Sequence, residues 1–188
     1  MFAMLQTLKP NAMEEKPRSV ISNGIYFGLI TGAVLIVFSL IMFLTDLYLN
    51  KAVSWIGYIF LIAGMIYGTL EFRKKYSNGF LSYGKAFSSC FWIGLFAGIL
   101  ATIYFYIFIQ FIHPGFINEL LDQIRANILT SKPDMSEEEV EQAVSMSSKF
   151  MSPVVMTLWG LAAYAIMSAI FALIIAIFLK KEEPEGTF

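Results

Sequence analysis

The chain has 188 residues, of which 57% are hydrophobic, 16% aromatic and 14% charged, and its mean hydropathy is +0.68. This composition excludes an ordinary soluble domain, and the apolar residues form unbroken runs, which are typical of bilayer-spanning helices. The net charge of −1 comes without a basic stripe, so we expect no nucleic-acid partner.

Residues 1–19 are polar and contain prolines and mixed charges, which predicts a disordered cytoplasmic tail. A first membrane span is predicted at about 20–47. Between Ile25 and Leu44 it has thirteen Leu, Ile, Phe or Val residues and no charge. At roughly −0.3 to −0.6 kcal/mol each, these side chains favour insertion by about 4 to 8 kcal/mol.

A short polar turn leads to the second predicted span, at about 53–72, and a turn of this length makes the two helices antiparallel neighbours. The segment Arg73–Phe87 follows as a basic connector with two glycines and four aromatic residues. The third span is predicted at about 86–111, where polar and helix-breaking residues end it.

Residues 113–152 form the one sizeable polar insertion. From 116 to 152 it has seven acidic and three basic residues, a net charge of −4. Apolar residues recur on one face of a helix at about Phe116–Leu129, and Ser136 with Glu139 forms a capping box for a second helix. We therefore predict an extracytoplasmic helical hairpin.

The last span is predicted at about 153–179, with Pro153 in its first turn and a polar cytoplasmic tail at 182–188 after it. The predicted fold is all-α: a polytopic membrane protein with four transmembrane helices in two hairpins. The membrane domain covers 20–181, and the helical hairpin is inserted between the third and fourth spans.

Small residues recur at four-residue spacing along the spans, as in GxxxG motifs that let two helix backbones approach closely. The alternative is that these glycines are ordinary filler of membrane helices. The candidate packing positions are Gly24, Gly28, Gly32, Gly64, Gly68, Gly94, Gly98 and Gly160.

The orientation follows from counting Lys and Arg on each side of the membrane. With four spans, both termini and the basic connector share one side, which has nine basic residues against four on the other. We therefore expect a multi-pass protein of the bacterial inner membrane with both termini in the cytoplasm and the acidic hairpin outside.

The segment Gly79–Phe87, GFLSYGKAF, resembles the connector between the second and third helices of a bacterial membrane family called domain of unknown function 4199. The acidic stretch Met135–Phe150, which leads into Met151-Ser152-Pro153, resembles that family's region before its last helix. The resemblance covers roughly 20–181. It implies a four-helix inner-membrane protein, found mainly in Bacteroidota, and it implies no activity.

No catalytic residue, cofactor site or metal site is predicted, and we expect the protein not to be an enzyme. Cys90 and His113 are the single cysteine and the single histidine, so neither a disulfide nor a Cys/His zinc cluster can form within the chain. Asp46 and His113 are both expected near the outer interface, where such a pair can relay protons or hold a metal. The alternative is that both are solvated residues at separate helix ends.

The basic connector has two interpretations. Its cations either only set the orientation of the protein in the membrane, or they also contact anionic lipid. Each such contact would favour binding to the membrane surface by about 1 kcal/mol per basic residue. The candidate lipid contacts are Arg73, Lys74, Lys75 and Lys85.

Two functions remain in competition. The first is a non-enzymatic accessory or scaffold subunit, which packs with a membrane-protein partner or with copies of itself. The second is a small transporter or channel for a solute or lipid, which requires polar groups along a cavity near the midplane. The available residues are Thr31, Ser39, Thr102, Thr157 and Ser168.

Overall fold

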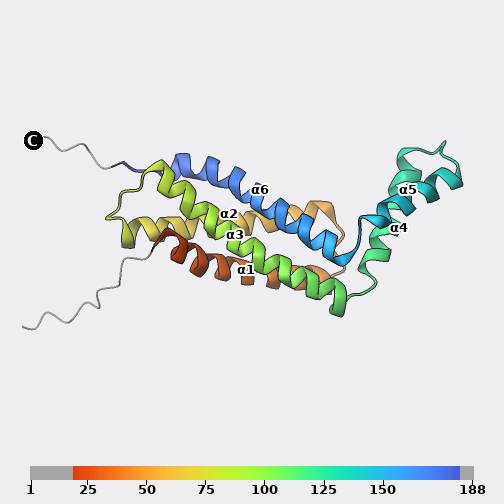
Figure 1. Cartoon of the computed structure of the whole chain (residues 1–188), viewed down its shortest axis with the longest axis horizontal. Coiled ribbons are helices and arrows are strands. Elements are labelled where there is room, and N and C mark those ends of the chain that lie inside the picture. The colour runs from red at the N-terminus through yellow and green to blue at the C-terminus, as the bar shows by residue number, and fades with distance from the viewer. Residues whose placement is uncertain (1–18, 183–188) are drawn as a thin grey trace, which may run out of the picture.

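The structure is a computed structural model, and it describes residues 19–182. Four long helices form an elongated bundle, and two shorter helices project from one end of it (Figure 1). We call the projecting pair the arm and the bundle end beside it the arm end. The opposite end, where Ser19 and Glu182 lie, is the termini end. The predictions for 1–18 and 183–188 lie outside the described residues.

The prediction of an all-α fold with four spans is confirmed. The bundle contains four helices that are long and apolar enough to cross a membrane. They are α1 (Val20–Leu44), α2 (Lys51–Tyr76), α3 (Tyr83–Ile107) and α6 (Pro153–Leu179). The arm consists of α4 (Phe116–Ser131) and α5 (Glu137–Lys149).

The helix ends are set by caps that can be read in the sequence. The side chains of Ser19, Asn50 and Ser152 each accept a hydrogen bond from a backbone N–H in the first turn of the helix that follows. Such caps satisfy N–H groups that have no partner within the helix. The predicted capping box of Ser136 and Glu139 is present at the start of α5.

The basic connector is shorter than predicted. Arg73–Lys75 form the last turn of α2, and α3 already begins at Tyr83, so the loop contains only 77–82. The prediction ended α2 at 72 because its apolar run ends there. Cations in a last turn are favourable beside the negative end of the helix dipole, so the charges continue the helix instead of ending it.

Two tight turns and one irregular helix end complete the chain path. Asp46, Asn78 and Gly79 have positive φ values of 55°, 48° and 82°, a conformation that Asn, Asp and Gly adopt most readily. At the arm end, α3 continues as a π-helical turn η1 (Phe108–Ile112), where the His113 N–H reaches the Phe108 carbonyl at 2.8 Å.

Helix α3 is the centre of the bundle. It packs most extensively against α1 and α6 and less against α2, whereas α2 and α6 meet at few points. Gly24, Gly28 and Gly32 face Trp92, Phe96 and Leu100 in the same order, so α1 and α3 run parallel. The tightest interface therefore joins the two predicted hairpins.

Close backbone approach is visible at the glycines. A Cβ added at Gly28 would lie 2.6 Å from the Phe96 Cβ and 2.9 Å from the Ile93 carbonyl oxygen. At Gly94 it would lie 2.4 Å from the Ser168 Oγ, and at Gly98 2.6 Å from the Tyr164 Cβ. No methyl group fits at these positions without a shift of the neighbouring helix.

A buried polar cluster near the termini end adds hydrogen bonds between three helices. The Asn23 Nδ2 donates to the Gly68 carbonyl at 3.1 Å and lies 3.4 Å from the Ser89 Oγ. The Thr69 hydroxyl donates to Ser89 at 3.1 Å. These side chains are fully buried, so their hydrogen bonds reduce the cost of placing polar groups in an apolar surrounding, while the Asn23 Oδ1 has no partner among the described residues.

The loop after α2 is fastened to the end of α6. Leu81 and Lys181 exchange two backbone hydrogen bonds, of 2.7 and 2.8 Å, in an isolated antiparallel bridge. Leu81 is buried against Phe72, Ala86 and Ala176. The termini end of the bundle is therefore closed.

We predict that Gly28→Ala destabilises the bundle by about 1 to 3 kcal/mol, because its methyl group would overlap Phe96 and the α3 backbone. Thermal unfolding in detergent measures this as a lower midpoint. Gly57→Ala is the matched control, since its Cβ would meet nothing closer than the Phe38 ring at 3.8 Å. Equal midpoints for the two variants would contradict the packing role of Gly28.

Candidate functional site

A cavity of about 270 Å³ lies within the arm-end half of the bundle. All four long helices line it, and Leu47 and Tyr48 from the α1–α2 loop lie at the side nearest the arm. A second hollow of about 280 Å³ lies between α2 and α6 alone. The two share Ser54, Gly57, Gly160 and Tyr164, so they adjoin.

Hydroxyl groups provide the polar part of the cavity lining, and no charged side chain contributes to it. Ser39, Thr102 and Tyr104 are prominent among these groups. The Thr102 hydroxyl donates back to the Gly98 carbonyl, and Ser54 donates to Asn50. The Tyr104 hydroxyl is buried next to Ser39 and, among the described residues, forms no well-aligned hydrogen bond.

Two glycines explain why this half of the bundle is hollow. A Cβ at Gly160 would meet only the Thr102 Cγ2, at 4.0 Å, and one at Gly57 only the Phe38 ring. Gly160 was predicted as a packing position together with Gly24, Gly28, Gly32, Gly64, Gly68, Gly94 and Gly98. Those seven are in close contact with a neighbouring helix, whereas Gly160 lines the cavity.

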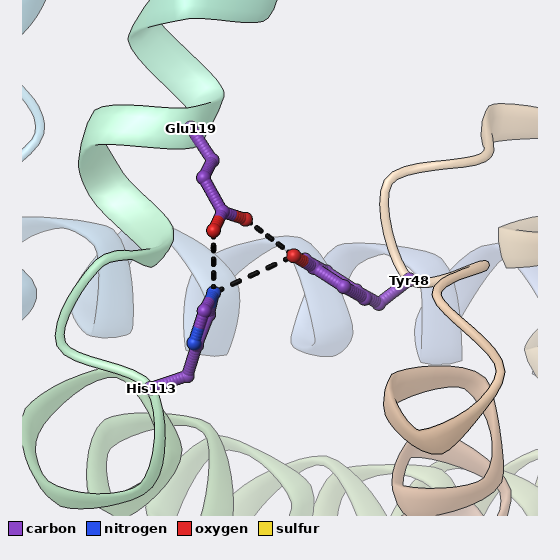
Figure 2. Close-up of polar contacts among 3 residues, drawn as sticks. All are labelled: Tyr48, His113 and Glu119. Carbon is purple, nitrogen blue, oxygen red and sulfur yellow. Dashed lines mark hydrogen bonds and ion pairs between the residues drawn. The ribbon is translucent and has the colours of Figure 1, made fainter.

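Three polar side chains form a cap where the arm joins the bundle. Figure 2 shows Tyr48 from the α1–α2 loop, His113 before α4 and Glu119 on α4 pointing toward one another. The His113 Nε2 lies 3.1 Å from the Glu119 Oε1 and 3.4 Å from the Tyr48 hydroxyl. The Tyr48 hydroxyl donates to the other carboxylate oxygen of Glu119.

The cap has a definite proton arrangement. Because the Glu119 carboxylate can only accept, His113 donates to it through Nε2–H. The hydrogen bond from Tyr48, followed by that from His113, lowers the pKa of Glu119. The same bond to Glu119, together with burial, raises the pKa of Tyr48 to about 12.

Aromatic rings surround the cap. The Phe43, Phe108 and Phe116 rings each lie within 6.5 Å of the His113 ring, measured between centroids. These rings come from the end of α1, from η1 and from the start of α4. The cap therefore fixes the root of the arm to the bundle through both polar and aromatic contacts.

His113 is neither paired with Asp46 nor a separate solvated residue. Its carboxylate partner is Glu119, six residues along the chain, and Asp46 lies in the left-handed turn that precedes Tyr48. Tyr48 and Glu119 had no predicted role, because no motif in the sequence near either residue marks it as a partner of His113. The spacing of His113 and Glu119 around the Pro114-Gly115 turn was the one available signal.

Among the described residues, no group of three His, Cys, Asp or Glu side chains could hold a metal ion. A nucleophilic mechanism requires a nucleophile beside the base. The described contacts of His113 are with Tyr48, Glu119 and phenylalanine rings.

The predicted lipid-contact residues lie at the termini end. Arg73 donates to the Leu179 carbonyl at 3.0 Å and so caps α6, and Lys75 pairs with Glu71 at 3.1 Å. Lys74 and Lys85 have exposed side chains. Lys181 joins this end, with its Nζ 5.6 Å from the centre of the Phe80 ring.

A family model described as "Protein of unknown function (DUF4199)" matches residues 26–181, which is most of the chain. The chain belongs to this family. The resemblance predicted from the connector and the acidic stretch is thereby confirmed, and the family supplies no activity. No curated protein and no solved structure matches the chain. With its four apolar helices, this DUF4199 member is a multi-pass membrane protein.

We predict that Glu119→Gln loosens the root of the arm, because a neutral amide is a weaker acceptor for Tyr48 and His113. Hydrogen exchange should accelerate at the start of α4. In the unchanged protein the same loosening should appear on acidification, because a lowered pKa gives a stabilisation that is lost as the pH falls through the folded-state value.

The matched control is Asp122→Gln, one turn further along α4, where the side chain is exposed. Exchange that changes equally in both variants would show that the cap does not hold the arm.

Proposed function

We propose that the protein is a non-enzymatic accessory subunit of the bacterial inner membrane that presents the arm to a partner. The observation that carries this proposal is the arm itself, which projects beyond the bundle and meets it at its root (Figure 1). The interhelical contacts of α4 are mainly with α5, so most of the arm surface is available to another protein.

The chemistry of the arm favours a basic partner. Residues 116–152 have a net charge of −4, and Glu137, Glu138 and Glu139 stand together in the first turn of α5. Apolar side chains are exposed beside them, among them Leu129, Met146 and Phe150. A mixed apolar and acidic surface of this kind suits a basic, partly apolar surface.

The glycine rows of the spans contribute indirectly. Gly24, Gly28 and Gly32 contact α3, and Gly94 and Gly98 contact α6, so these rows are occupied within the bundle. We therefore assign partner binding to the arm and assign the glycines to the rigidity of its support. A homo-oligomer would have to form through other surfaces.

The proposed orientation places the arm outside the cytoplasm. In the sequence, the two terminal segments and the connector between α2 and α3 contain nine basic residues, and the segments between the other helices contain four. On the cytoplasmic side, Lys74 and Lys85 are the exposed candidates for anionic lipid, with Arg73 and Lys75 engaged as described above.

The second candidate function is a small transporter. Ser39 and Thr102 line the cavity, as that function requires, whereas Thr31 and Ser168 are buried against the glycines Gly64 and Gly94. On the side of the cavity toward the termini end, the fully buried side chains of Leu61, Met65 and Ile93 fill the bundle. Transport would require these side chains to separate, so a blind pocket supports this function less well than an accessory role.

Purification of the tagged full-length protein in mild detergent, followed by mass spectrometry, tests the accessory role. We expect a stoichiometric membrane partner that is lost from the Glu137→Gln/Glu138→Gln variant and weakened by salt. Glu182→Gln, which removes an exposed charge at the opposite end, should retain it. A homo-oligomer that passes solute in liposomes would contradict the proposal.

The orientation has its own test. Lys75→Cys and Glu138→Cys, each in a Cys90→Ser background, should react oppositely with a membrane-impermeant maleimide applied to intact spheroplasts. We expect labelling of the Glu138→Cys protein alone, and labelling of the Lys75→Cys protein only after lysis. The same response from both positions would refute the orientation.

A further inference from the structure

The arm-end cavity has no part in the accessory role, yet it has the features of a binding site. It is bordered by four helices and partly open, and its volume of about 270 Å³ lies near the lower end of the ~300–1,000 Å³ typical of ligand pockets. The seven close-packed glycines show that these helices can pack without a gap between them. The hollow therefore forms only where the residues that line it keep the helices apart.

The lining selects an uncharged ligand. Its polar groups are hydroxyls, and no Lys, Arg, Asp, Glu or His contributes to it. A charged head would be removed from water without a counter-charge, which is strongly unfavourable. Among the lining hydroxyls, Ser39 can donate to an oxygen-bearing head, whereas an apolar molecule without oxygen atoms offers it no acceptor.

The route into the cavity lies between α2 and α6. These two helices meet at few points, and the second hollow between them is lined by Gly57, Gly160 and Ala163. The outer faces of these two helices are apolar, with Ile59 and Ile166 exposed at more than 60%. A ligand would therefore come from the lipid phase, with its tail remaining between the two helices.

We infer that the cavity binds one uncharged, lipid-soluble molecule that has a carbonyl or ester head and a long apolar tail. The oxygen-bearing head contacts Ser39, which lines the cavity, and the tail leaves the bundle between Gly57 and Gly160 into the bilayer. A membrane quinone and a diacylglycerol share this chemistry. Measuring which of the two binds shows which one is the source of the ligand.

Native mass spectrometry of the detergent-solubilised full-length protein tests the inference with four probes. Decylubiquinone and dioleoylglycerol represent the two sources of an uncharged head, dioleoylphosphatidylglycerol has a charged head, and hexadecane has none. We expect saturable one-to-one binding of decylubiquinone or of dioleoylglycerol and much weaker binding of the other two lipids. Absence of saturable binding for both uncharged probes, or equal binding of the charged lipid, would overturn the inference.

Variants locate the site. Gly160→Leu should fill the cavity and weaken binding of the successful probe at least tenfold, since its side chain would point into open space. Gly84→Leu is the matched control, because a Cβ there has no neighbour within 4 Å and the residue lies at the termini end. Equal binding by the two variants would place the ligand elsewhere.

A third variant decides the case if Gly160→Leu shows a lowered unfolding midpoint. Ser39→Ala removes only the hydroxyl, so it should weaken binding roughly three- to tenfold, the value of one hydrogen bond. Tyr26→Phe, on the exposed face of α1, should leave binding unchanged. Unchanged binding by Ser39→Ala would show that the head does not reach this hydroxyl and would overturn the inference.

Discussion

The close contact of α3 with α1 and α6 is the interaction on which the rest of the structure depends. In lipid, helices gain nothing from hiding apolar surface from water, so association depends on packing and on hydrogen bonds between helices. Gly24, Gly28 and Gly32 bring α1 against α3, and Gly94 and Gly98 bring α6 against its other side. The hydrogen bonds of Asn23 with Gly68 and Ser89 add to this packing near the termini end of the bundle.

The close packing is also what makes the arm end different. Gly57 and Gly160 lack side chains as the other glycines do, yet no neighbouring helix fills the space that they leave. A glycine in a membrane helix can therefore permit close contact with a neighbouring helix or leave an empty space beside it. Which of the two occurs depends on how closely the neighbouring helix approaches. At the arm end α2 and α6 stay apart, and hydroxyl groups line the space between the helices.

The sequence predicted the elements of this fold well, because unbroken apolar runs and side-chain caps are local signals. The range of α6 and the capping box of α5 agree with the predicted ones. The end of α2 was misplaced because hydropathy marks the end of an apolar run, whereas the helix continues through Arg73–Lys75. Family membership was also accessible, since short motifs such as Gly79–Phe87 are read directly from the residues.

The site was much harder to predict from the sequence than the fold. The spacing of Gly24, Gly28 and Gly32 reveals a packing face but not which helix packs on it. The position of the cavity depends on which helices are in contact. The cap joins Tyr48 to residues 65 and 71 positions away, a distance over which no periodicity carries information. Asp46 was the more obvious partner for His113 because it is charged, whereas Tyr48 forms the contact through a neutral hydroxyl.

Tyr48 connects the cavity to the arm, because its side chain lines the cavity and donates a hydrogen bond to Glu119 of α4. Its hydroxyl is committed to Glu119, so the position of α4 fixes where the Tyr48 ring stands at the cavity wall. A ligand that displaced this ring would have to break or stretch the bond to Glu119, and a movement of the arm would shift the ring in return. Linkage makes such an effect reciprocal: any free energy by which arm docking alters ligand binding equals that by which the ligand alters docking. Phe105 makes a second such connection, because it lines the cavity and its ring lies 5.8 Å from the Phe116 ring of α4, measured between centroids.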